Sequence, residues 1–179
     1  YAKGRPGQLT FASGGSGTAI HLAGELFKTM AGVDLVHVAY KGGGPAMTDL
    51  IGGQVSLLFD QISTALPYAQ SGRLRALAVT TGKRSPAAPQ IPTIAEAALP
   101  GYAVTTWHGL LAPAGTPRDI VARLSAETAK ALQNADIRER FAAQGVDPIA
   151  STPEQFSAMM KSELEKWRGV IAASGTKIE

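Results

Sequence analysis

Six consecutive small residues, Ser13-Gly14-Gly15-Ser16-Gly17-Thr18, form the most distinctive chemical pattern in this sequence of 179 residues. They follow a short apolar run that predicts a strand, and they precede an amphipathic pattern that predicts a helix. The first backbone N–H groups of a helix have no partner inside it and attract anions. The hydroxyls of Ser13, Ser16 and Thr18 are further donors. The pattern therefore predicts a site for a carboxylate or phosphate, although a tight turn that binds nothing has the same composition.

The loop lacks the features of two well-known phosphate-binding loops. Ile20 stands where a dinucleotide-binding loop has its third glycine. No Gly-Lys-Ser or Gly-Lys-Thr follows, as it does in the loops of nucleoside triphosphatases. We therefore expect neither nucleotide class, and we predict no cofactor.

Polar residues also follow the next two strands of the predicted sheet. Tyr40 and Lys41 lead into a second glycine-rich loop, and Asp60 ends the third strand. Ligands of open α/β sheets bind outside the carboxyl ends of the strands. We therefore expect Tyr40 to line a pocket, Lys41 to supply positive charge and Asp60 to accept from an amine or hydroxyl. A surface lysine and an aspartate that caps the next helix are the alternatives without a ligand.

A catalytic interpretation of the same loops is weaker. Ser13 or Ser16, His21 and Asp60 have the types needed for a nucleophile, a base and a group that orients the base. However, the chain has no Gly-x-Ser-x-Gly sequence, the signature of a nucleophile elbow. His21 shares a polar helical stripe with Glu25 and Lys28, so we expect a histidine that is either solvated or at the edge of a cleft. We therefore predict no catalytic residue and no enzymatic activity.

The composition excludes several further classes of site and partner. The chain has no cysteine, so disulfides and thiolate metal sites are excluded. Its three histidines are dispersed, and we predict no metal site. The net charge is +3, and the 17 Lys and Arg residues are scattered rather than clustered. Because nucleic-acid binders concentrate positive charge on one face, we expect no nucleic-acid partner.

The ends and the hydropathy of the chain give two further expectations. No apolar stretch approaches the roughly 18–20 residues that a membrane-spanning helix needs. The chain does not begin with Met and shows no signal-peptide pattern, so we expect its start to be a truncation.

Strand and helix patterns alternate through the first half of the chain, which is typical of βαβ units on a parallel sheet. We expect strands at 9–12, 33–40, 55–59 and 74–80, and helices at about 18–32, 45–52 and 66–71. The third strand is nearly all apolar, as in a strand that is buried on both faces. This order predicts one doubly wound α/β lobe.

The second half changes to helices after an extended segment at 102–111. Thr116 and Pro117 predict a helix start, with a hydroxyl cap and a proline at the first helical position. A second helix is expected at 135–145, and a capping pattern at Thr152 opens a last helix that ends near residue 172. These helices have apolar stripes but no sheet of their own, so we expect them to need a partner outside this chain.

Five segments together resemble the substrate-binding receptors of tripartite tricarboxylate transporters, also called Bug-type extracytoplasmic solute receptors. In the order of that family they are Leu9–Phe27, Val36–Gly43, Gly53–Asp60, Leu74–Thr81 and Trp107–Pro117. The resemblance spans essentially all 179 residues. The ordered combination is far more specific than any single loop.

The resemblance implies a two-lobed α/β fold of the type II periplasmic-binding-protein kind, a Venus flytrap that closes on a small carboxylate. The loop from Ser13 to Thr18 is implied to clamp the carboxylate, and Asp60 is implied to be a specificity residue. Tyr40, Lys41 and Thr106 are implied to lie near the cleft.

The resemblance also implies a division of the chain into two parts. Residues 1–104 would form the second ligand-binding lobe. Residues 105–179 would form a crossover strand and helices that pack on a first lobe, which is missing here.

The implied function is that of a periplasmic receptor, monomeric at full length, that delivers its ligand to integral membrane transporter subunits. The ligand would be a dicarboxylate or tricarboxylate, an amino acid or an aromatic carboxylate. The alternative is the co-inducer-binding domain of a LysR-type transcriptional regulator. That alternative needs an attached helix-turn-helix, which the sequence does not contain.

Overall fold

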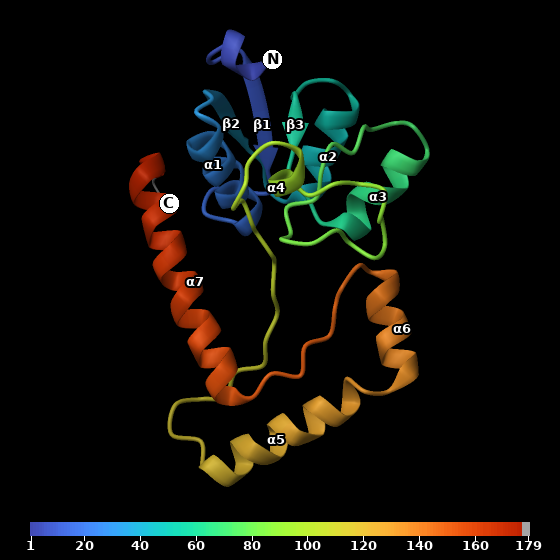
Figure 1. The fold of residues 1–179 in the computed structure, drawn as a ribbon, viewed down its shortest axis with the longest axis vertical. Helices are drawn as coiled ribbons and strands as arrows, with labels where there is room; N and C mark the ends of the chain where they lie inside the picture. The colour runs from blue at the N-terminus through green and yellow to red at the C-terminus, as the bar shows by residue number, and fades with distance from the viewer. Residues whose placement is uncertain (177–179) are drawn as a thin grey trace. The chain divides into compact units, whose positions relative to one another are not determined.

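The computed structural model describes residues 1–176 and divides into two compact units (Figure 1). The first unit contains residues 1–105 and the chain from Trp167 onward, and the second contains Thr106–Lys166. The sheet belongs to the first unit, whereas the second is built from helices and loops. No helix formed by residues 1–176 is both long enough and apolar enough to cross a membrane.

A parallel three-stranded sheet with the order β2-β1-β3 forms the centre of the first unit. The strands are β1 (Leu9–Ser13), β2 (Leu35–Ala39) and β3 (Leu57–Leu58). In the register of this sheet, Phe11 of β1 pairs with His37 on one side and with Leu57 on the other. Because the strands are parallel, their carboxyl ends and the loops that follow them lie at one edge.

In the first unit, α1 (Ala19–Ala31) and α2 (Gly43–Ile51) connect the strands, and α3 (Ile62–Gln70) and α4 (Ile94–Ala97) follow the last strand. A short 3-10 helix at Ala2–Gly4 precedes them. The second unit contains α5 (Arg118–Ala131) and α6 (Ala135–Ala143). The long helix α7 (Pro153–Ser174) begins in the second unit and ends in the first.

Neighbouring residues of β1 build the core on both faces of the sheet, because successive side chains of a strand point to opposite faces. Phe11 is completely buried, and its ring lies against α1 at Gly24. Ala12 packs on the other face with Ala46 of α2 and with Val55. Helices therefore cover both faces of a parallel sheet, which confirms the predicted α/β class.

The chain after α3 returns to the face of the sheet that α1 covers. Ile94 of α4, Tyr102 and Val104 form a buried cluster with Ala23 of α1, and Trp167 of α7 packs against it. The hydroxyl of Tyr102 donates to the carbonyl of Ala23 over 2.9 Å, and burial raises the pKa of this phenol. The cluster fixes the end of the first unit on α1.

The predicted fourth strand at 74–80 does not form. That segment has one isolated parallel bridge, between Val79 and Thr93, and no ladder. The segment at 102–111 also forms no strand. The third strand is shorter than predicted, and its two residues are only half-buried. A strand needs a neighbour to satisfy its backbone groups, and the part of the chain that is described supplies none beyond β3.

The helices of the first unit differ from the prediction at two places. α3 begins at Ile62, four residues before the predicted start, and α4 was not predicted. α4 starts with a capping box in which the side chains of Thr93 and Glu96 each accept from the other residue's N–H. Its Thr-x-x-Glu sequence is a recognised helix start, so this signal was available.

The two helix starts predicted in the second half have opposite outcomes. The cap of α5 is Pro117 rather than Thr116, whose hydroxyl donates instead to the carbonyl of Pro113. The capping pattern before α7 is confirmed, because the N–H of Thr152 donates to Gln155 Oε1 and the N–H of Gln155 donates to Thr152 Oγ1.

The second unit lacks a buried core. Every residue from 106 to 166 is at least partly exposed. Its aromatic contact is local, with the rings of Trp107 and Phe156 meeting edge to face at 5.5 Å. Ile120 and Leu124 of α5 are 47% and 55% exposed. The apolar stripe that the sequence shows on α5 is therefore unpartnered within the described residues.

We expect Gly24→Ala to destabilise the first unit, because a Cβ at this position would overlap the Phe11 ring. Overpacking of this kind costs about 1–3 kcal/mol. Chemical denaturation of the protein expressed from its complete reading frame would measure the loss. Gly169→Ala in α7 is the matched control, since nothing lies within 4 Å of its Cβ position. An equal free energy of unfolding in both variants would show that Phe11 has room to move.

Candidate functional site

The glycine-rich loop joins the carboxyl end of β1 to the start of α1. Gly15 and Gly17 have φ angles of 142° and 79°, in a region that favours glycine. Thr18 is the N-cap of α1, and its Oγ1 accepts from the N–H of His21. The same hydroxyl donates to the carbonyl of Gly15 over 2.8 Å. The loop is thus held in shape by its own polar groups.

Three backbone N–H groups of this loop and helix start have no hydrogen-bond partner in the described part of the chain. They are those of Ser16, Ala19 and Ile20. Ser16 and Ala19 are also exposed. Unsatisfied donors at the positive end of a helix dipole form a site for an anion.

The loop after β2 lies directly against this first loop. The N–H of Tyr40 donates to the carbonyl of Ser13 over 2.9 Å, and the N–H of Gly42 donates to the carbonyl of Gly14 over 3.0 Å. A Cβ on Gly14 would lie 3.2 Å from backbone atoms of Gly42 and Gly43. The start of α2 therefore lies beside the loop that leads into α1, and both face the same edge.

Tyr40 and Lys41 have different roles in this loop. The hydroxyl of Tyr40 donates to Asp49 Oδ2 of α2 over 2.7 Å, and this hydrogen bond raises the pKa of Tyr40. Tyr40 thus ties the loop to α2. Lys41 is exposed and forms no ion pair with the described part of the chain. It is therefore an unpaired cation in the loop that lies beside these backbone donors.

Asp60 follows β3 at the same edge of the sheet and carries an unsatisfied oxygen. Its Oδ1 accepts from the N–H of Gln61 over 2.8 Å, whereas its buried Oδ2 has no partner among residues 1–176. Burial raises the pKa of this carboxyl. The capping alternative is wrong, because the N-cap of α3 is Gln61. A buried unsatisfied oxygen costs about 1–3 kcal/mol, so Asp60 is a candidate acceptor for a ligand.

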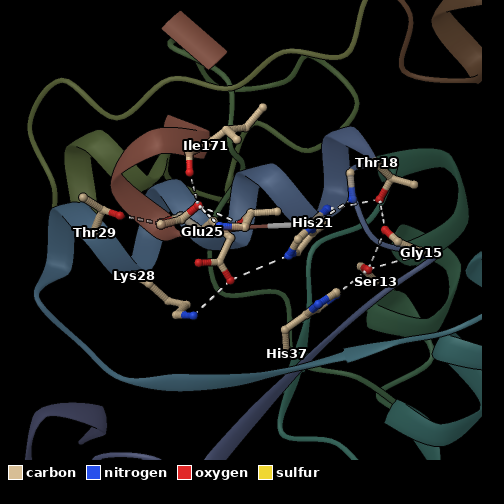
Figure 2. A network of polar contacts seen from close by, with 12 residues as sticks. Ser13, Gly15, Thr18, His21, Glu25, Lys28, Thr29, His37 and Ile171 are labelled. Carbon is tan, nitrogen blue, oxygen red and sulfur yellow. Dashed lines mark hydrogen bonds and ion pairs between the residues drawn. The ribbon is translucent and has the colours of Figure 1, made fainter. Parts of the chain in front are cut away.

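The hydroxyl of Ser13 points into the protein rather than toward the exposed donors (Figure 2). Its Oγ lies 2.7 Å from His37 Nε2 and also hydrogen-bonds with the N–H and the carbonyl of Gly15. Ser13 therefore stabilises the loop through hydrogen bonds on its buried side.

A stacked pair of histidines lies beneath the loop (Figure 2). The rings of His21 and His37 are 3.8 Å apart and nearly parallel, at 17°. His21 Nδ1 accepts from the N–H of Gly17 over 3.0 Å, and its Nε2 lies 3.7 Å from Glu25 Oε1. Lys28 pairs with the same carboxylate oxygen at 2.9 Å.

The expected solvation of the His21 and Glu25 stripe is wrong. His21 is 4% exposed and Glu25 is 5% exposed. For His21 the reason is that the His37 ring of β2 stacks on it. Because Phe11 and His37 pair in the sheet, both side chains lie on the face that α1 covers. The alternation of side chains along the predicted strand was therefore the signal that could have placed His37 against His21.

The grouping of Ser13, His21 and Asp60 that a catalytic interpretation would need, and that the sequence did not favour, does not form. Ser13 meets His37 instead, at a distance typical of a nucleophile and its base. However, Ser13 is 0% exposed, and burial next to His21 lowers the pKa of His37 to about 4. A serine that a substrate cannot reach, next to a histidine that is such a weak base, does not suit catalysis at neutral pH.

Thr106 is the remaining residue that was predicted to lie near a ligand. Thr106 is exposed and belongs to the second unit, so its place near the cleft stays a prediction. Among residues 1–176, no group of three or more His, Cys, Asp or Glu is arranged to hold a metal ion.

Residues 1–176 match the family model of the tripartite tricarboxylate transporter family receptor, TctC. The chain belongs to this family. The receptor resemblance is thereby confirmed, and the regulator alternative is not retained. Members of this family are solute receptors, not an enzyme class.

Curated relatives of this receptor family cover the whole chain. A UPF0065 protein from the tcbD-tcbE intergenic region of Pseudomonas sp. (strain P51) is 44% identical over 171 residues, which are 95% of this chain and 51% of that protein. Protein BugT of Bordetella pertussis is 37% identical over 177 residues, which are 99% of this chain and 54% of BugT. The chain thus spans about half the length of these relatives.

Several solved structures share the fold, among them the periplasmic binding protein BugD, with a TM-score of 0.83 at 34% identity, covering 100% of this chain and 60% of that one. Rpa4515 of R. palustris, solved with adipate, has a TM-score of 0.87 at 37% identity, covering 98% of this chain and 59% of that one. MatC from Rhodopseudomonas palustris, with bound malate, has a TM-score of 0.75 at 35% identity, covering 92% and 57%. These likenesses confirm the receptor fold for the part that the chain represents.

We expect the stability of the protein to fall with pH between about 6.5 and 4 because of His37. In this window the unfolded chain binds a proton that the folded chain, with a pKa of about 4, does not. The free energy of unfolding therefore decreases as the pH falls, by about 3 kcal/mol at most. Urea denaturation at several pH values measures this slope.

His37→Gln keeps a polar atom near the position of Nε2 but does not titrate, so its slope should be shallower than that of the wild type. His108→Gln is the control, because His108 is exposed. An unchanged slope in His37→Gln would contradict the assignment.

Proposed function

We propose that this chain is the second lobe, with the return helices, of a periplasmic receptor that captures a small carboxylate for integral membrane transporter subunits. The observation that carries the proposal is the set of unpartnered N–H groups at Ser16, Ala19 and Ile20, next to the free cation Lys41. Family membership supports the receptor role and the periplasmic location. The bound adipate and malate of the two structural relatives support a carboxylate ligand.

Fixed backbone donors suit a carboxylate because they need no rearrangement when the ligand arrives. Hydrogen bonds to a charged group contribute about 1.5–3 kcal/mol each. Hydrogen bonds of Ser13 and Thr18 already hold the loop in shape, so ligand binding costs little further conformational entropy. Capture followed by closure of two lobes then requires no reactive group.

Asp60 supports a ligand that carries a hydrogen-bond donor as well as a carboxylate. Its unpartnered Oδ2 lies at the carboxyl edge of β3. A ligand hydroxyl or amine would satisfy this oxygen, whereas a second carboxylate close to it would be repelled unless Asp60 is protonated. We therefore favour hydroxy acids and amino acids over plain dicarboxylates.

We expect Ala19→Pro to weaken carboxylate binding about tenfold or more, because it deletes one backbone donor worth about 1.5–3 kcal/mol. Proline is well tolerated at the first position of a helix. The preceding residue, Thr18, already has the extended conformation that proline requires, with φ −69° and ψ 158°. Titration calorimetry with adipate, malate and succinate, on the protein expressed from its complete reading frame, measures the effect.

Ala135→Pro is the matched control, because Ala135 is the first residue of α6 and Asn134 before it is also extended. Both variants should keep the wild-type stability, and the control should keep its affinity. Equal affinity in Ala19→Pro and the wild type would remove the α1 start from the site. Malate should bind more tightly than succinate, which lacks the hydroxyl, and Asp60→Ala should remove that preference.

The exposed apolar stripe of α5 supports a further part of the proposal. We propose that the helices of the second unit pack on the other lobe of the receptor. Ile120 and Leu124 lie on one face of α5 and are about half exposed. The structural relatives are longer than this chain, which covers 57% to 59% of them. Burying these side chains against the other lobe would give the second unit the core that it lacks.

We expect Leu124→Asp to cost at least about 2 kcal/mol in the protein expressed from its complete reading frame, because it would bury an unpaired charge. Ala126→Asp is the matched control, since it lies two residues further along α5 and turns away from that face. It should change the free energy of unfolding by only about 0.5 kcal/mol. A similarly small effect of Leu124→Asp would argue that this stripe faces water.

A further inference from the structure

The stacked histidine pair, of which His21 is buried and His37 is half-buried, joins three elements that must stay together for the proposed anion site to exist. His21 belongs to the first turn of α1, and His37 belongs to β2. Each ring hydrogen-bonds with the glycine-rich loop, His21 through Gly17 and His37 through Ser13. The two rings stack on each other at 3.8 Å. The pair is therefore a bridge from the loop to both a helix and a strand.

The hydrogen bond from Gly17 fixes the protonation state of His21. Its Nδ1 accepts from a backbone N–H, so this nitrogen carries no proton. The proton of the neutral ring is then on Nε2, which faces the carboxylate of Glu25 at 3.7 Å. A second proton on Nδ1 would set two N–H groups against each other, and the bond to Gly17 would be lost.

The charged groups around the pair come mainly from α1. Glu25 and Lys28 of that helix form an ion pair at 2.9 Å, and the ammonium of Lys28 also lies over the Phe11 ring. β1 contributes the uncharged Ser13 and Phe11, and the labelled residue of α7 near Glu25, Ile171, is also uncharged (Figure 2). Desolvation lowers the pKa of both histidines, which supports a neutral pair at neutral pH.

We propose that His21 and His37 are positioning residues of the carboxylate site: as neutral rings they hold the loop in the shape that exposes its backbone donors, and protonation of His21 releases Gly17 and weakens binding. This inference rests on the proposed function, which supplies the carboxylate. A new charge on His21 would also attract an anion. Glu25 lies close enough to offset most of that charge, so the loss of the loop's shape dominates.

Two substitutions of His21 separate the hydrogen bond from the charge. In His21→Asn, Oδ1 takes the place of Nδ1 and accepts from Gly17, but it does not titrate. His21→Leu cannot accept at all. Calorimetry with adipate and malate at pH 7.5 would give His21→Asn an affinity within about threefold of the wild type and His21→Leu an affinity about tenfold weaker or worse.

The pH dependence gives a readout that a purely structural role would not move. Between pH 7.5 and pH 5.0, the ratio of the wild-type dissociation constant to that of His21→Asn should rise, because only the wild type can take up a proton at position 21. Protonation of adipate or malate cancels in this ratio, because both proteins meet the same ligand. His108→Asn should follow the wild type. A ratio that stays constant, or that falls toward pH 5.0, would overturn the positioning role.

The amide of Gly17 tests the inference without any ligand. Its hydrogen exchange, followed by NMR in the protein from the complete reading frame, should be slow in the wild type and in His21→Asn but fast in His21→Leu. If neither acid binds the wild type, the proposed function fails for these ligands, whereas slow exchange in these two proteins still supports the positioning role. Equal exchange rates in all three would refute it.

Discussion

The close approach of two backbone segments, at Gly14 and at Gly42 and Gly43, is the constraint on which the candidate site depends. The hydrogen bond from Gly42 to Gly14 continues the pairing of β1 with β2 beyond the last residues of the strands. Because neither loop has a side chain at the contact, the starts of α1 and α2 come to the same edge of the sheet. A parallel sheet by itself places its loops at one edge. The contact between these two loops brings them together, so that they form one continuous surface.

The polar groups around that surface are divided into two layers. Those below it satisfy one another: Ser13 meets His37, Gly17 meets His21, and Glu25 meets Lys28. The groups without a partner in the described chain are the backbone donors and the exposed Lys41, together with the buried Oδ2 of Asp60. The inner layer is neutral at its histidines and rigid, which is what allows the outer layer to remain unsatisfied without collapsing onto itself.

Local patterns of the sequence predicted much of this arrangement. The α/β class, the first two strands, α1 with its start near Thr18 and the loops that carry the polar residues all follow from periodicity and from glycine. The fourth strand failed because strand formation depends on a neighbour, which propensity does not describe. The burial of His21 was missed for a similar reason: a polar stripe on a helix indicates solvent only when no second polar group covers it, and His37 lies 16 residues away in sequence.

The crowding at Gly14 has an evolutionary consequence. A side chain there would push the two loops apart, and positive φ angles also restrict Gly15, Gly17 and Gly42. A receptor built on this frame therefore has little freedom to change ligand through its glycine loop. Diversification must use positions whose side chains already point outward, such as Ser16 and Lys41, or the oxygen of Asp60. Under the proposed function, the backbone donors of the glycine-rich loop would bind a carboxylate in each such receptor, and the variable side chains would contact the rest of the ligand.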